Sequence, residues 1–149
     1  MRIGFVSSHG GHLTHLLWLR AWWEQHDRFW VAADRPDVHD RLVGERVHLL
    51  PADRSRSVRQ AAGQLWSAPR ILACERPDVL VSAGAGVAVP FFLAARAMAI
   101  PSVFLEVYDR VERPTLTGRL VKPIATKMLV QWPEQQSFYG DAICVGNLR

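Results

Sequence analysis

The chain is 149 residues long, carries a formal net charge of +4 and is 49% hydrophobic. This length predicts a single domain with its own hydrophobic core, large enough to fold without disulfides. The basic charge suits an anionic membrane surface or an acidic substrate, whereas basic residues interleaved with acids, rather than gathered in a stripe, argue against nucleic acid.

Three features bear on the compartment. Cys74 and Cys144 lie in apolar surroundings without redox or metal-ligand spacing, so we expect reduced core residues, which favours the cytoplasm. The first ten residues predict a strand and a glycine turn rather than a signal peptide. The uncharged run 79–95 contains two glycines and a proline and is shorter than the roughly 20 residues of a membrane span, so we expect a buried strand and helix there.

The chain begins with a predicted strand over 2–7, whose apolar run is 3–6, followed by a polar turn and a helix over 11–25. A nearly all-apolar strand is typical of a parallel sheet buried on both faces. A strand that ends in two glycines before a helix turns backbone N–H groups toward a ligand. We therefore expect a ligand at the turn Ser7-Ser8-His9-Gly10-Gly11-His12.

The helix after this turn is rich in tryptophan. His15, Trp18 and Trp22 share one of its faces, and Trp23 follows directly. Tryptophans at this spacing either pack against a neighbouring helix or form an exposed patch for a partner or a bilayer surface. Both interpretations stay open at this point.

The middle of the chain predicts strands over 29–33 and 47–50 around a short helix capped by Asp37, and then a helix over 58–74 that bends or stops near Pro69. Before this long helix three arginines lie close together, either as solvated surface or as a site for phosphate or anionic lipid headgroups. They are Arg54, Arg56 and Arg59.

A second glycine turn, Gly84-Ala85-Gly86, follows a predicted strand over 79–82 and opens a helix over 87–98. A strand over 102–105 comes next and ends at Glu106, which begins the most charged loop of the chain. In open α/β sheets ligands bind at this carboxyl edge of the strands. Further elements are expected as a helix over 115–125 and strands over 128–131 and 142–145. The whole predicts an α/β fold with a Rossmann-like parallel sheet and helices on both faces.

Histidine and glycine positions suggest two kinds of chemistry. His12 is expected in the first turn of its helix, where the helix dipole favours the neutral imidazole that a general base requires. The spacing of His9, His12 and His15 without a further ligand is poor evidence for a metal. The second glycine turn with Glu106 twenty residues on also resembles a dinucleotide fingerprint that lacks its third glycine, so an NAD-binding oxidoreductase is an alternative.

Several motifs in this order resemble the membrane-associated acceptor subunit of the two-component UDP-N-acetylglucosamine transferase of dolichol-linked oligosaccharide synthesis. The bacterial exopolysaccharide PssD-like proteins are closer still, and the N-terminal half of MurG is more distantly similar. The motifs are Ser8-His9-Gly10-Gly11-His12, Ser82-Ala83-Gly84-Ala85-Gly86, Ile100-Pro101-Ser102-Val103, Glu106 with Arg110, Thr115-Leu116-Thr117-Gly118-Arg119 and Val130-Gln131-Trp132-Pro133.

The resemblance implies the N-terminal half of a GT-B glycosyltransferase, with residues 1–149 as one acceptor-binding domain and the donor-binding domain on a separate chain. It implies inverting transfer from a nucleotide sugar, expected to be a UDP-sugar, to a lipid-diphosphate-linked acceptor at the cytoplasmic face of a membrane. Eukaryotic members carry an N-terminal membrane helix that this sequence lacks, so we expect peripheral attachment to an anionic membrane. A non-catalytic scaffold that recruits the catalytic partner to the membrane is the alternative.

The resemblance also assigns roles to residues. His12 is the expected base, with Glu106 as its rival. Acceptor contacts are expected from Ser8, His9, Gly10, Gly11, Gly84, Ala85, Gly86 and Arg110. Contacts with the partner or the membrane are expected from Trp18, Trp22, Trp23, Gln131 and Trp132. No Asp-x-Asp motif marks a metal-held nucleotide, so we expect no metal and no cofactor. Val107 stands where the family usually has serine, which bears on substrate specificity.

Overall fold

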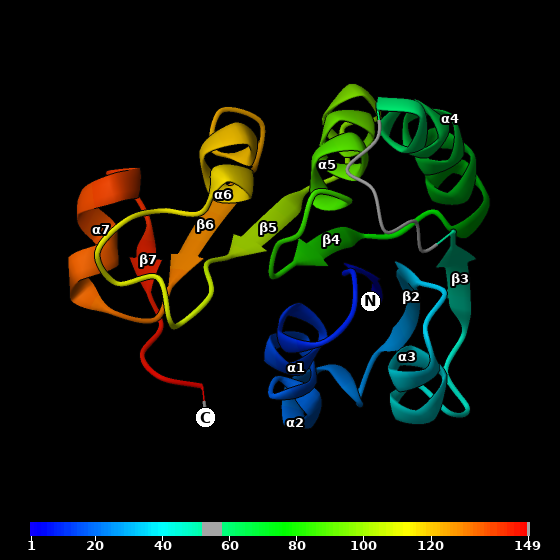
Figure 1. Cartoon of the computed structure of the whole chain (residues 1–149), viewed down its shortest axis with the longest axis horizontal. Coiled ribbons are helices and arrows are strands. Elements are labelled where there is room, and N and C mark those ends of the chain that lie inside the picture. Colours follow the sequence, from blue (N-terminus) through cyan, green and yellow to red (C-terminus); the bar gives the residue numbers. More distant parts are fainter. Residues whose placement is uncertain (52–57, 149) are drawn as a thin grey trace.

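The computed structural model describes residues 1–51 and 58–148, and of residues 58–62 it describes the backbone alone. Within these residues seven parallel strands form one sheet in the order β3-β2-β1-β4-β5-β6-β7 (Figure 1). The strands are β1 (Arg2–Val6), β2 (Asp27–Ala33), β3 (Val47–Leu50), β4 (Val79–Ser82), β5 (Ser102–Leu105), β6 (Lys127–Val130) and β7 (Ile143–Cys144).

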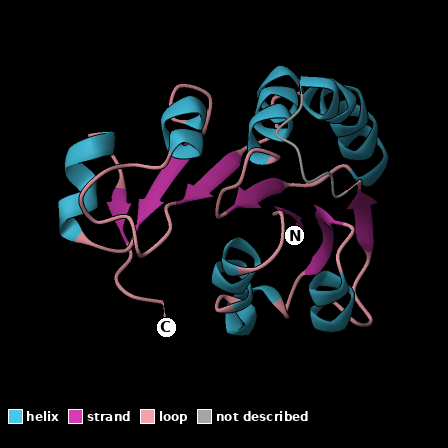
Figure 2. Cartoon of the chain, viewed as in Figure 1, coloured by secondary structure: helices cyan, strands magenta, loops and turns pink. Residues whose placement is uncertain are grey.

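Helices cover both faces of this sheet. One layer holds α1, α2 and α3, the opposite layer holds α4, α5 and α6, and α7 lies beside β6 and β7 at the end of the sheet (Figures 1 and 2). This arrangement confirms the expected Rossmann-like α/β fold. The helices are α1 (Gly11–Leu17), α2 (Arg20–Trp23), α3 (Pro36–Arg41), α4 (Val58–Glu75), α5 (Ala88–Ala97), α6 (Leu116–Val121) and α7 (Pro133–Tyr139).

Two hydrophobic clusters, one on each face, fill the space between sheet and helices. On the α1–α3 side the Phe5 ring stacks on Trp30 with 4.4 Å between ring centroids, and Trp23 packs edge-on against both rings. Trp23 is 2% exposed, and its indole N–H donates to the Leu16 carbonyl. The expected contact of Trp23 with a partner or membrane is therefore wrong, because this side chain belongs to the core.

The helix expected over 11–25 is interrupted between α1 and α2, where Leu19 leaves helical geometry. The helix α4 continues through Pro69, which was expected to bend or stop it. The structure also contains α7, which the sequence pattern did not predict. Its stretch lacks an apolar period and is stabilised by the contacts of a buried glutamine described below.

The expected core position of the cysteines is wrong for Cys74, which lies exposed near the end of α4; Cys144 is half-buried and packs against the core. Neither forms a disulfide. The cluster expected around Arg54 and Arg56 lies outside the described residues, as does the side chain of Arg59. Among the residues that are described, no helix has the length and apolar character needed to cross a bilayer.

Candidate functional site

The two glycine turns lie side by side at the carboxyl edge of the sheet. Strand β1 pairs with β4 in a register that sets Val6 beside Ser82, the last residue of each strand. The chain then passes from β1 to α1 in one layer and from β4 toward α5 in the other (Figure 1). A crevice at such a switch in strand order is where ligands bind in open parallel sheets.

Ser82 fastens the second turn to the first strand. Its buried hydroxyl donates to the Val6 carbonyl at 2.7 Å and accepts the Gly84 N–H at 3.2 Å. The turn then runs through positive φ at Gly84 (118°) and at Ala85 (66°), a region that residues with a side chain seldom adopt. Strained backbone held in this way is a feature of functional sites.

His12 joins the two turns. Its Nδ1 lies 3.0 Å from the Ala83 carbonyl oxygen, and a Cβ added to Gly84 would lie 2.9 Å from the same nitrogen. Because a carbonyl can only accept, the proton of the neutral ring resides on Nδ1. The lone pair is then on Nε2, and the side chain is half-buried rather than enclosed. This is the tautomer and the exposure that a general base needs.

The first glycine turn is clamped by α3. The Gly10 N–H donates to the Asp37 carboxylate at 3.0 Å, while Arg41 donates to the Gly10 carbonyl at 3.3 Å and to the Thr14 hydroxyl at 2.9 Å. The N–H groups of Gly10 and Gly84 are therefore engaged within the chain. Of the predicted acceptor contacts, Gly11 and Gly86 border open space, since a methyl group added to either would meet no atom within 4 Å. Ser8 is half-buried and His9 is exposed.

Glu106 lies at the end of β5 and is fully buried. One carboxylate oxygen accepts the Val107 N–H at 3.0 Å; the other accepts the N–H and the hydroxyl of Thr115, each at 3.2 Å, and the hydroxyl of Tyr139. Burial and the adjacent carboxylate raise the pKa of Tyr139, so the phenol stays a donor. Both oxygens of Glu106 therefore accept from donors of the chain itself, and they join the two ends of the loop that follows β5, at Val107 and Thr115.

This environment also bears on the dinucleotide alternative. A fingerprint acid must accept ribose hydroxyls, and the Glu106 oxygens already hold four hydrogen bonds from the chain. The structure gives the NAD-binding interpretation no support.

The loop between β5 and α6 is held by side chains from the segment 131–135. Gln131 donates from its amide to the Glu106 carbonyl at 3.1 Å, and Trp132 donates from its indole to the Tyr108 carbonyl at 2.8 Å. Gln135 donates to the Val107 carbonyl at 2.9 Å and accepts the Gln131 N–H at 2.9 Å. Gln131 is 1% exposed, so its expected contact with a partner or membrane is wrong. Sequence reasoning missed Gln135, because it missed α7.

The sequence matches the family described as "Oligosaccharide biosynthesis protein Alg14 like" over residues 10–148. The chain belongs to the Alg14-like family. The mouse UDP-N-acetylglucosamine transferase subunit ALG14 is 23% identical, over 99% of this chain and 83% of its own length. A second relative, the UDP-N-acetylglucosamine--N-acetylmuramyl-(pentapeptide) pyrophosphoryl-undecaprenol N-acetylglucosamine transferase of Geobacillus kaustophilus, is 34% identical, over 50% of this chain and 20% of its own length. The resemblance drawn from the motifs is thereby confirmed.

Solved structures agree on the fold. Acinetobacter baumannii MurG superposes with a TM-score of 0.75 at 19% identity, over 89% of this chain and 42% of the MurG chain. The UDP-GlcNAc 2-epimerase of Methanocaldococcus jannaschii, solved with UDP-GlcNAc and UDP, superposes with a TM-score of 0.78 at 15% identity, over 99% of this chain and 47% of the epimerase chain. The Alg14-like chain thus has the fold of a GT-B N-terminal half and spans less than half the length of these two structures.

The remaining predicted residues of this Alg14-like chain differ in exposure. Trp18 is half-buried, with its ring 4.6 Å from the His15 ring; Trp22 is 43% exposed on α2. His15 donates from Nδ1 to the Gly11 carbonyl at 2.7 Å and accepts the Tyr108 N–H at Nε2, so it links the glycine turn to the loop after β5. Both of its nitrogens are engaged, whereas Nε2 of His12 has no hydrogen-bond partner among the residues that the structure describes. Arg110 is exposed on that loop, and Trp132 is half-buried.

Proposed function

We propose that this chain is the acceptor-binding subunit of an inverting glycosyltransferase. A separate donor-binding subunit holds a nucleotide sugar, and the acceptor is a lipid-diphosphate-linked sugar. The observation that carries the proposal is His12, which stands between the two glycine turns with Nδ1 on the Ala83 carbonyl and Nε2 unprotonated. Two comparisons support a sugar nucleotide and an oligosaccharide precursor as the substrates. The family is described by oligosaccharide biosynthesis, and the mouse relative is named as a UDP-N-acetylglucosamine transferase subunit.

In the proposed step the acceptor hydroxyl gives its proton to Nε2 of His12 while its oxygen attacks the anomeric carbon. The bond from that carbon to the nucleotide phosphate breaks, and the nucleoside diphosphate leaves with the electron pair. The Ala83 carbonyl, which accepts from Nδ1, orients the ring and stabilises the positive charge that forms on it. Deprotonation by a positioned base contributes roughly 10²–10⁴-fold to such a rate.

Other residues position the acceptor. Gly11 and Gly86 border the open part of the crevice, where the acceptor approaches the backbone closely, with Ser8, His9 and Ala85 beside them. The exposed guanidinium of Arg110 pairs with the acceptor diphosphate. We give Glu106 a positioning role, because its bonds to Thr115 and Tyr139 hold the loop that carries Arg110.

Two further points belong to the proposal. The transfer needs no metal, since the sequence contains no Asp-x-Asp motif to hold a metal–nucleotide complex. The subunit works at the cytoplasmic face of a membrane, to which it attaches peripherally, because that is where a lipid-linked acceptor meets a nucleotide sugar.

The test is a transfer assay on the complex purified from its host, with UDP-N-acetylglucosamine as donor and polyprenyl-diphosphate N-acetylglucosamine as acceptor. His12→Ala should lower kcat by roughly 10²–10⁴-fold and leave the donor KM unchanged. His26→Ala is the control, since His26 directly precedes β2 at the amino edge of the sheet, opposite the crevice, and this variant should match the wild type. A chelator should not change the rate.

Transfer by the His12→Ala complex at the wild-type rate would show that His12 is not the general base. A partner that alone transfers the sugar to a water-soluble acceptor as fast as the complex does would instead favour the non-catalytic scaffold.

A further inference from the structure

The reverse turn that follows β5 is held by a buried amide. The Arg110 N–H donates to the Val107 carbonyl at 3.4 Å and closes the turn. Gln135 donates from its side-chain nitrogen to both ends of it, to the Val107 carbonyl at 2.9 Å and to the Arg110 carbonyl at 3.3 Å. Gln135 is fully buried, and its side-chain oxygen accepts two backbone N–H groups directly after β6. Its amide thus uses both donors and both lone pairs and fixes residues 107–110, which we call the β5 turn.

Tyr108, the first corner of the β5 turn, is fastened at its backbone and at its ring. Its N–H donates to Nε2 of His15 at 3.4 Å, and its carbonyl accepts the Trp132 indole N–H at 2.8 Å. The centroid of its ring lies 5.5 Å from that of His15 and 5.9 Å from that of Trp18. The side chain is half-buried, so part of the ring remains accessible. A ring held in this way is preorganised for a ligand.

The contacts of Tyr108 place it at the border of the crevice. His15, against which its ring packs, follows His12 by three positions on α1. Residues at this spacing are neighbours on a helix surface, with about 5–6 Å between their Cβ atoms. Nδ1 of His15 also donates to the Gly11 carbonyl at 2.7 Å, so the same imidazole is bonded to the first glycine turn. Tyr108 therefore packs on the nearest histidine neighbour of the proposed base.

The two residues after Tyr108 carry opposite charges. Asp109 and Arg110 are exposed, and neither has an ion-pair partner in the part of the chain that the structure describes. A carboxylate accepts hydrogen bonds from hydroxyl groups, a guanidinium binds phosphate, and an aromatic ring packs on the apolar face of a pyranose. Because the Cα atoms at the two ends of a reverse turn lie within about 7 Å of each other, all three side chains can reach one ligand of the size of a sugar diphosphate.

We propose that the β5 turn selects the acceptor by its first sugar, the sugar that is bonded to the diphosphate. Tyr108 stacks on the sugar ring, Asp109 accepts from its hydroxyl groups, and Arg110 holds the diphosphate. The attacking hydroxyl and the phosphate lie on different carbons of one ring, so a sugar with that hydroxyl at His12 passes Tyr108 before its phosphate meets Arg110. The inference rests on the proposed function and adds which part of the acceptor is recognised, and by which side chains.

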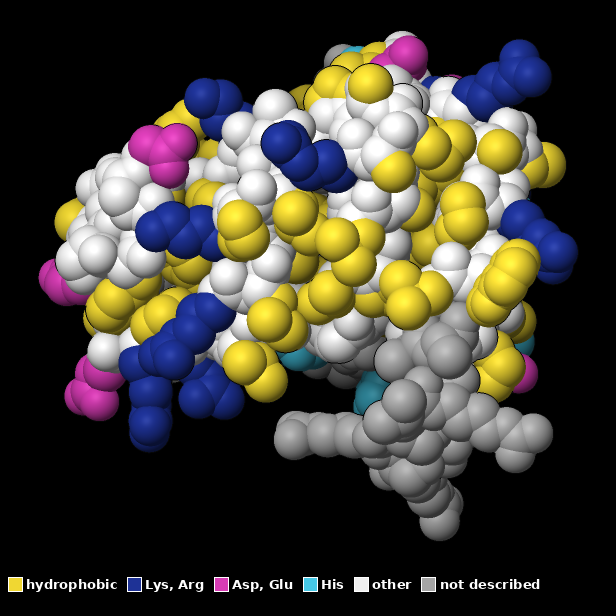
Figure 3. All heavy atoms as spheres, turned by 90° about the horizontal axis from the view of Figure 1, so that it is seen from above, with side chains coloured by type: hydrophobic (Ala, Val, Ile, Leu, Met, Phe, Trp, Pro, Cys, Tyr) yellow, Lys and Arg dark blue, Asp and Glu magenta, His cyan; other side chains and the backbone are white. Residues whose placement is uncertain are grey.

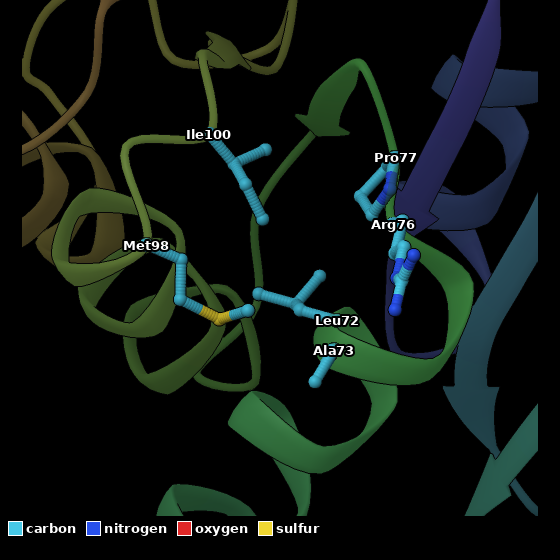
Figure 4. A pocket seen from close by; sticks show the side chains of 6 residues that line it. All are labelled: Leu72, Ala73, Arg76, Pro77, Met98 and Ile100. Carbon is cyan, nitrogen blue, oxygen red and sulfur yellow. The ribbon is translucent and has the colours of Figure 1, made fainter.

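Two other surfaces lack this combination of groups. On the outer side of α4, α5 and α6, hydrophobic side chains lie among lysine and arginine (Figure 3), and the one carboxylate in the sequences of these helices, Glu75, is buried. A groove of about 400 Å³ between the last turns of α4 and α5 is apolar except for the guanidinium of Arg76 (Figure 4). Its other lining residues are Leu72, Ala73, Pro77, Met98 and Ile100. Neither surface presents a carboxylate to sugar hydroxyl groups.

The test is calorimetric titration of the purified complex with a water-soluble, short-chain polyprenyl-diphosphate N-acetylglucosamine, and with the same diphosphate without its sugar. Tyr108→Ala and Asp109→Ala should each weaken binding of the sugar-bearing ligand about tenfold and leave binding of the sugar-free ligand unchanged. Arg110→Gln should weaken binding of both ligands. The matched controls are Trp66→Ala, an exposed aromatic side chain on α4, and Asp141→Ala, an exposed acid before β7 at the amino edge; both should bind as the wild type does.

The transfer assay gives a second readout. With the soluble acceptor, Tyr108→Ala should raise the acceptor KM about tenfold and leave the donor KM unchanged. Tyr108→Phe keeps the ring and should restore the wild-type KM. Gln135→Glu has the size of the wild-type side chain but no amide donor for the two carbonyls of the β5 turn, so it should raise the acceptor KM as well. A side chain that merely supported the fold would change the KM of both substrates.

Failure of the inference and failure of the proposed function give different results. Acceptor binding that Tyr108→Ala and Asp109→Ala leave unchanged would refute the role of the β5 turn alone. Equal losses for the ligands with and without the sugar would show that these side chains do not recognise the sugar. A wild-type complex that binds no acceptor would refute the proposed function, and the inference with it. Urea unfolding of each variant checks that the fold is intact.

Discussion

His12 and Glu106 both follow buried strands at the same edge of the sheet, and their hydrogen bonds separate their roles. Nδ1 of His12 donates to the Ala83 carbonyl, and Nε2 has no hydrogen-bond partner in the part of the chain that the structure describes. Glu106 is enclosed and accepts from Val107, Thr115 and Tyr139. A base must reach the substrate, so geometry favours His12, while the buried carboxylate serves the backbone around it.

The pKa of Tyr139 gives a prediction at this scale. Burial and the Glu106 carboxylate raise that pKa well above its usual value of about 10, so the folded state holds the phenol proton more tightly than the unfolded state does. The contribution of Tyr139 to the free energy of unfolding should therefore be fully present below about pH 10, and it should be lost as the pH rises further. Tyr139→Phe should remove this fall. At neutral pH it should cost about 1–3 kcal/mol, because the buried carboxylate loses a donor.

Urea unfolding at neutral pH and above about pH 10 measures both effects. The chain has two tyrosines, so Tyr108→Phe is the matched control and should keep the wild-type decline at high pH. A decline of equal size in Tyr139→Phe would show that another group causes it.

At the scale of elements, α3 acts as the support of the first glycine turn. Asp37 accepts the Gly10 N–H, and Arg41 reaches both the Gly10 carbonyl and the Thr14 hydroxyl. The turn needs this support because Gly10 has a φ of 61°, and a flexible glycine would otherwise sample many conformations. A helix from the second β-α-β unit of the chain thus fixes the geometry in front of His12.

Asp37→Ala should release that turn. Loss of a hydrogen bond to a charged acceptor should speed exchange of the Gly10 amide hydrogen roughly tenfold or more, and Asp37→Asn should fall between the two. Hydrogen exchange read residue by residue by NMR makes the measurement. Asp40→Ala, an exposed carboxylate on the same helix, is the control. Equal exchange in Asp37→Ala and Asp40→Ala would mean that α3 does not hold the turn.

For the molecule as a whole, the elements that the sequence predicts correctly are those in which glycine or proline bounds an apolar run. The strands β1, β4 and β5 and both glycine turns are of this kind. Residues 133–139 could not be predicted as a helix, because the contacts that stabilise α7 come from Gln135 bonding to the loop after β5. That pairing depends on tertiary structure and leaves no period in the sequence.

The site was predictable in part for the same reason. Glycine spacing predicted the two turns, which the structure sets side by side with His12 between them, but sequence cannot tell which glycine N–H is already engaged by Asp37 or Ser82. Tryptophan was also ambiguous: Trp23 enters the core, whereas Trp66 is the most exposed tryptophan of the described residues. Both lie in helices rich in apolar residues, and only the packing of the layers decides which side faces water.

A network of charged side chains lies at the amino edge of the sheet, where it joins segments that are distant in the chain. Glu75 at the end of α4 accepts from His48 at 2.7 Å and from Arg46 at 3.1 Å. Arg46 also pairs with Asp27 at 2.8 Å, and Asp27 pairs with Arg2 at 2.6 Å. Arg2 in turn donates to the Glu75 carbonyl at 2.7 Å. The network therefore ties α4 to β1, β2 and β3.

Burial decides which ion pairs of the molecule matter for its stability. The Glu75 side chain is 7% exposed, whereas Glu24, which pairs with Arg20 one turn away at 3.4 Å, is 51% exposed. Glu75→Ala should lower the free energy of unfolding by about 1–3 kcal/mol, because it leaves the groups around a buried acceptor unpaired. Glu24→Ala should change it by less than about 0.5 kcal/mol. Urea unfolding of both variants makes the comparison, with Glu75→Gln expected between Glu75→Ala and the wild type. Equal losses from the two alanine variants would mean that the amino-edge network adds no more than an exposed helix pair, and that α4 is held to the sheet by its apolar side alone.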